Sequence, residues 1–182
     1  MRKTLKNMTL SAMFLAIGML LPFLTGQIQQ IGNMLLPMHI PVLLCGLICG
    51  WPYGLAVGFF LPLLRSVCFG MPVFFPNAAS MAFELATYGV VTGILYGRSQ
   101  WKCIFSLYRA LIPAMIAGRI VWGIAQMIFL GISGNPFTWQ MFLAGALLNA
   151  TPGIILQLIL IPVIMVALKK AGMVHFHRGC KQ

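Results

Sequence analysis

Residues 104–130 read IFSLYRALIPAMIAGRIVWGIAQMIFL, an apolar run interrupted by only two charges, Arg109 and Arg119. The run is longer than the ~20 residues that a helix needs to cross a bilayer core about 30 Å thick. The whole 182-residue chain has the same character: 60% of its residues are hydrophobic and 7% are charged, against about 25% charged in ordinary soluble domains. A soluble domain of this size cannot bury so much apolar surface. The composition therefore predicts an integral membrane protein in a lipid bilayer.

Similar apolar runs on both sides of this one predict an all-α bundle of six transmembrane helices, forming a single membrane domain over residues 1–182. The six runs cover residues 8–24, 36–49, 54–69, 78–96, 104–130 and 141–168. The second and third runs are separated only by Gly50-Trp51-Pro52-Tyr53-Gly54. This segment is typical of a turn and carries aromatic residues of the kind found at membrane interfaces.

The basic residues predict how the bundle is oriented. The chain has twelve Lys and Arg residues and one acid. Most of the bases lie before the first run, between the fourth and fifth, or after the sixth: Arg2, Lys3, Lys6, Arg98, Lys102, Lys169, Lys170, Arg178 and Lys181. With six spans these three groups share one side, which the positive-inside rule predicts to be cytoplasmic, together with both termini. Bases at the edges of apolar runs also argue against nucleic acid as a partner.

The shortage of acids excludes several classes of enzyme. Glu84 is the only acid, so the chain has no carboxylate pair for metal, glycosidic or phosphoryl chemistry. No phosphate-binding Gly-x-x-x-x-Gly-Lys-Ser/Thr loop occurs. Cys45 with Cys49, or His175 with His177, could touch a metal, but each pair lacks further ligands nearby. We therefore expect no catalytic residue, no cofactor and no metal.

Ionisable residues inside the spans are the first candidates for a binding site, because they are costly in lipid. Glu84 lies on the fourth span, Arg119 on the fifth and Arg65 on the third, and His39 opens the second. Glu84 can neutralise one arginine, so the other should be answered by water or by an anionic group of a small solute. The alternative is that Arg65 extends toward the outer surface while Glu84 and Arg119 form a structural bridge.

Polar neighbours extend this candidate site. Tyr88 lies one turn from Glu84, and Trp122 and Gln126 share a helical face with Arg119. Asn149 lies on the sixth span on the same stripe as Gln157, where inter-helix hydrogen bonding is an equal alternative. Asn33 lies in an outer loop rich in amides, which could close over a ligand or be an ordinary wet loop.

The first span carries Ala12 and Ala16, a pair of small residues that lets another helix approach closely. With this motif, the stretches 36–46, 50–54 and 81–89, and the six-span topology, the chain resembles the substrate-binding S component of energy-coupling factor (ECF) vitamin transporters. The resemblance covers essentially the whole chain. It implies a six-helix protein of the bacterial plasma membrane that is not an enzyme.

The resemblance also implies the partners. An S component captures a vitamin or related micronutrient from outside. It docks through the Ala12 and Ala16 face onto a transmembrane coupling (T) component, which two cytoplasmic ATPase subunits drive. The alternative is a non-catalytic assembly subunit of another membrane complex, which would have no ligand site.

Overall fold

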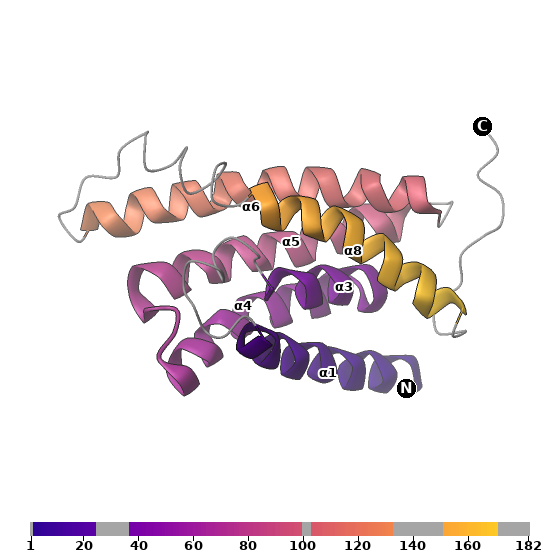
Figure 1. Ribbon diagram of the computed structural model, residues 1–182, viewed down its shortest axis with the longest axis horizontal. Helices are drawn as coiled ribbons and strands as arrows, with labels where there is room; N and C mark the ends of the chain where they lie inside the picture. Colours follow the sequence, from indigo (N-terminus) through magenta and orange to yellow (C-terminus); the bar gives the residue numbers. More distant parts are fainter. Residues whose placement is uncertain (1, 25–36, 100–102, 133–150, 171–182) are drawn as a thin grey trace.

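The computed structural model describes residues 2–24, 37–99, 103–132 and 151–170, and within these ranges the ordered elements are helices (Figure 1). The described ranges contain six α-helices and one short π-helical turn, η1. Their bounds are α1 (Arg2–Leu24), α3 (His39–Cys49), α4 (Trp51–Phe69), η1 (Phe74–Ala78), α5 (Ala79–Arg98), α6 (Ile104–Ile132) and α8 (Thr151–Lys170).

Helix α5 lies at the centre of the bundle, where it packs against α3, α4 and α6. Helix α1 lies at one edge and contacts α3 and α4, whereas α8 lies beside α6 on the other side (Figure 1). The side chains of a central helix can contact residues of several neighbouring helices at once. Glu84 and Tyr88 are both on α5 and are both 1% exposed.

Five helices of the described part are long and apolar enough to cross a membrane: α1, α4, η1 with α5, α6 and α8. Helix α3 is apolar but has 11 residues, about 16 Å of helix at 1.5 Å per residue, which is half of a bilayer core. The last expected span, 141–168, overlaps α8, and its first part lies outside the described residues. The count of six spans and the side of the termini therefore stay predictions.

The boundary between α3 and α4 differs from the predicted five-residue turn. Only Gly50 separates the two helices, with a φ of 97° that favours glycine, and α4 begins at Trp51. Pro52 is compatible with this early start because the first turn of a helix leaves its N–H groups unpaired in any case. The Pro and Gly of this segment thus begin a helix instead of forming an open loop.

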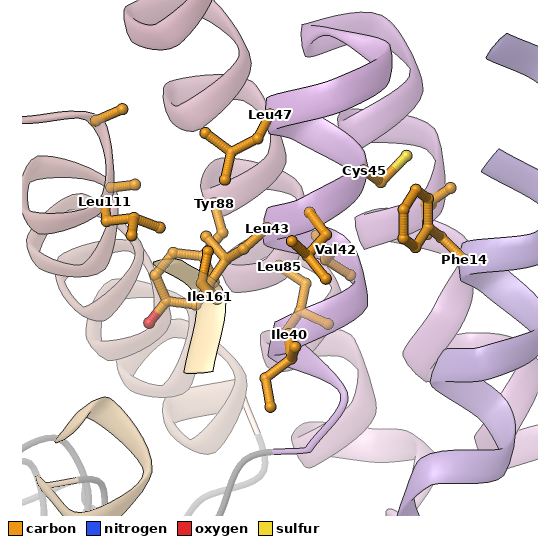
Figure 2. Packing of buried hydrophobic residues seen from close by; sticks show 14 of the residues in the cluster. Phe14, Ile40, Val42, Leu43, Cys45, Leu47, Leu85, Tyr88, Leu111 and Ile161 are labelled. Carbon is orange, nitrogen blue, oxygen red and sulfur yellow. The ribbon is translucent and has the colours of Figure 1, made fainter. Parts of the chain in front are cut away.

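The core joins residues from nearly every helix of the described part. Figure 2 shows Phe14 of α1 and Val42 of α3 packed together, with Leu85 of α5, Leu111 of α6 and Ile161 of α8 completing the cluster. Between α4 and α5 the backbones approach so closely that a Cβ on Gly54 would lie 2.8 Å from the carbonyl oxygen of Gly89. This packing holds α5, and therefore Glu84, in a fixed position.

Candidate functional site

Three side chains from three helices converge on one oxygen of Glu84. The Tyr88 hydroxyl of α5 donates a hydrogen bond to Glu84 Oε1 at 2.9 Å. Arg119 Nη1 of α6 lies 3.2 Å from the same oxygen, and His39 Nε2 of α3 lies 3.5 Å from it. We call these four residues the Glu84 network. A buried carboxylate is stable only when it is paired and hydrogen-bonded, and this network supplies both.

Tyr88 is placed by its contacts with two helices. Its ring meets the His39 ring edge-on, with 5.2 Å between the ring centroids. On the other side it lies on the backbone of α6 at Gly118, where a Cβ would be 2.8 Å from Tyr88 Cζ. Any larger residue at position 118 would therefore displace Tyr88 and its bond to Glu84.

Arg119 is only partly satisfied by the network. Its Nη1 faces Glu84, while Nε and Nη2 are buried and have no hydrogen-bond partner among the residues that the structure describes. The side chain is 13% exposed. Buried donors of a charged group are costly when unpaired, so these two N–H groups are available for a ligand.

The amide side chains of Gln126 on α6 and Gln157 on α8 are also buried. Gln126 Nε2 donates to Asn77 Oδ1 at 3.3 Å. Gln126 Oε1, and Gln157 Nε2 of α8, are buried and without a hydrogen-bond partner in the described part of the chain. Trp122 is half-buried on α6 between Arg119 and Gln126. The polar face expected on this helix is therefore present.

Arg65 lies apart from the Glu84 network and faces α1. Its Nη1 donates to the Met19 carbonyl at 2.9 Å, and its guanidinium lies over the rings of Phe23 and Phe69 at 5.4 and 5.6 Å. The sequence predicts Arg65 as a binding-site candidate together with Glu84 because both are ionisable residues inside the expected spans. In the structure, Arg65 of α4 contacts Met19 and Phe23 of α1 and so attaches α1 to α4.

The remaining predicted residues fall in two groups. Ala12 and Ala16 are exposed on α1 and leave that face of the helix open. Asn33 and Asn149 lie outside the described residues. Within the described ranges, no group of three or more His, Cys, Asp or Glu side chains could hold a metal ion.

Two residues of the site were missed by sequence reasoning. Asn77 orients Gln126, and Gly118 makes room for Tyr88. Asn77 sits just before an apolar run, where an amide is expected in any loop. Gly118 precedes Arg119 directly, and this adjacency is the one signal that could have identified it.

Comparison with known proteins places the chain in a family. A family model described as "ECF transporter, substrate-specific component" matches residues 6–165. The comparisons with curated proteins and with solved structures found no match. The match spans most of the chain, including most of α1 and the complete Glu84 network, and it confirms the predicted resemblance. The chain therefore belongs to the family of substrate-specific components of ECF transporters, which are membrane transport subunits.

Proposed function

We propose that this subunit captures a vitamin or related small organic micronutrient at the Glu84 network. The observation that carries the proposal is the pair of buried N–H groups on Arg119 that have no partner in the described part of the chain. A structural salt bridge alone would leave no reason to bury these donors unpaired. A ligand group with acceptors would satisfy them.

The proposed substrate carries an anionic or similarly acceptor-rich group. A guanidinium is planar and binds carboxylate or phosphate through parallel hydrogen bonds. Glu84 already lies 3.2 Å from Arg119 and offsets its charge. The preference for acceptors therefore rests on the free N–H groups and no longer on a surplus of positive charge.

The proposed site is completed by residues of several segments. His39, Tyr88, Trp122 and Gln126 would surround the substrate. Asn33 and Asn149 are proposed to contact it from segments next to α3 and α8. The substrate would enter from outside, since the positive-inside rule places the Gln126 end of α6 away from the cytoplasm.

The subunit would pass its substrate to partners. We propose docking through the exposed Ala12 and Ala16 face of α1 onto a T component, which two cytoplasmic ATPase subunits drive, in the bacterial plasma membrane. Small residues favour close approach of a second helix. An energy source outside the chain is required because the sequence has no nucleotide-binding loop.

Native mass spectrometry of the protein purified in mild detergent from cells in rich medium tests the proposal. We expect a bound small molecule in the mass range of vitamins, released when the protein unfolds. An empty protein that instead carries a stable membrane partner would contradict capture and favour the assembly-subunit alternative.

A further inference from the structure

Two buried polar side chains on the same face of α6 have hydrogen-bonding atoms without a partner in the described part of the chain. Arg119 and Gln126 are seven residues apart, with Trp122 between them, so all three share one stripe. At 1.5 Å of rise per residue, the Cα atoms of Arg119 and Gln126 are about 10 Å apart along the helix axis. The guanidinium of Arg119 and the amide of Gln126 thus follow one another along one face of α6.

The Arg119 end offers donors. Nη1 faces Glu84, whereas Nε and Nη2 form the adjacent edge of the guanidinium and are buried without a hydrogen-bond partner in the described residues. Two parallel N–H groups match a planar edge with two acceptors. A carboxylate has this edge, and so does a carbonyl beside a ring nitrogen, as in guanine. Because Glu84 already offsets the charge, both kinds of edge are compatible with this end.

The Gln126 end offers an acceptor. Its Nε2 is held by Asn77 Oδ1 at 3.3 Å, which fixes the amide and directs Oε1 elsewhere. This oxygen is buried and has no hydrogen-bond partner in the described part of the chain. A hydroxyl or an N–H of a ligand would satisfy it.

We infer that the substrate lies along this face of α6 and carries two separate groups, a two-acceptor edge that binds Arg119 and a hydrogen-bond donor that binds Gln126 Oε1. Its middle lies against Trp122. This inference rests on the proposed function and narrows it, because a solute with an acceptor edge but no separate hydrogen-bond donor would leave Gln126 Oε1 unsatisfied.

The test compares native mass spectra of the wild-type protein, Arg119→Lys and Gln126→Met, all purified from the same cells. Lysine keeps a charge opposite Glu84 but has no planar fork, so the loaded fraction should correspond to binding at least about tenfold weaker. Gln126→Met removes one neutral hydrogen bond, and binding should weaken about two- to tenfold. Arg109→Lys and Gly131→Ala, exposed or facing open space on the same helix, should load like the wild type.

Fragmentation of the released wild-type molecule is a test that needs no variant. It should show a carboxylate or a carbonyl beside a ring nitrogen, and a separate hydroxyl or N–H donor. A molecule without these groups, or wild-type loading of Arg119→Lys or Gln126→Met, would overturn this inference and leave capture intact. An empty wild-type protein would overturn the proposed function, and the inference with it.

Discussion

Glu84 is the residue on which the interior of the bundle depends. It is the only acid of the chain, it is 1% exposed, and it contacts side chains of α3, α5 and α6. Taking a charge out of water costs several kcal/mol unless a partner compensates for it. Glu84 and Arg119 therefore stabilise the fold only as a pair.

Replacement of Glu84 by glutamine should destabilise the protein by about 3–5 kcal/mol, because Arg119 would remain buried and charged without its partner. The double variant Glu84→Gln/Arg119→Met should be less destabilised than Glu84→Gln alone. Thermal unfolding in detergent measures both, with Thr87→Val as a neighbouring control on α5. If Glu84→Gln unfolds at the wild-type temperature, the pair has no structural role.

A second prediction at this scale concerns Gly118. Alanine there would clash with the Tyr88 ring, and overpacking of this kind costs about 1–3 kcal/mol. The displaced hydroxyl should leave Glu84, so we expect weaker loading with the co-purified molecule. Gly131→Ala on the same helix meets no atom within 4 Å and should change neither loading nor unfolding temperature. Equal loading of both variants would show that Tyr88 adapts without loss.

The residue types of the network could be predicted from sequence, but their partners could only partly be predicted. Glu84 and Tyr88 follow from helical spacing, and Arg119 from its cost in lipid. Arg65 has the same cost, yet its partner is a backbone carbonyl of α1 flanked by aromatic rings. Helical periodicity gives the face of a residue on its own helix, not the neighbour that this face meets.

At the scale of elements, α1 is the helix that connects the fold to the proposed partner. Side-chain contacts attach α1 to the neighbouring helices α3 and α4 at three positions along its length. Asn7 Nδ2 donates to the Cys49 carbonyl at 3.3 Å, the Cys45 thiol lies 3.6 Å from Ser11 Oγ, and Arg65 reaches Met19. These contacts hold α1 against α3 and α4, while Ala12 and Ala16 stay exposed.

Loss of the Arg65 attachment should loosen one end of α1. Arg65→Gln removes the contacts with Phe23 and Phe69, each worth about 0.5–2 kcal/mol for a cation over a ring. We expect faster hydrogen exchange in the last turns of α1 and a lower unfolding temperature, while loading with the co-purified molecule stays unchanged. If the variant loses the co-purified molecule and hydrogen exchange in α1 is unchanged, Arg65 contacts the substrate and does not attach α1.

The docking face is tested by Ala12→Leu combined with Ala16→Leu. Two larger side chains would keep a second helix from close approach, so co-purification with the T component should fall strongly. Both positions are exposed, so substrate loading should be unchanged. The matched control is Met13→Leu, an exposed position of the same helix. Normal co-purification of the double variant would exclude this face as the docking site.

The elements were more predictable in position than in extent. Apolar runs located the described helices because burial in lipid needs a long apolar segment. The joint between α3 and α4 was predicted as a turn of five residues, yet only Gly50 lies outside both helices. Proline and glycine are typical of loops and of helix starts alike, so sequence alone could not separate these two uses.

At the scale of the whole molecule, the topology depends on how many times the chain crosses the membrane before the end of α4. The charge pattern predicts three crossings, by α1, the segment with α3, and α4. Helix α3 itself has 11 residues, about half the length that a crossing needs. If this segment does not cross, α1 and α4 return the chain to the side on which it began.

Cys68 can distinguish these two topologies. It is the exposed free cysteine near the end of α4, whereas Cys45 and Cys49 are buried. In a background with Cys103 and Cys180 replaced by serine, a membrane-impermeant maleimide should label Cys68 in intact cells. Lys3→Cys, with Cys68 also replaced by serine, should react only after the cells are opened. Labelling of both positions only in opened cells would mean that α1 and α4 cross but the α3 segment does not, and the bundle would then have five spans.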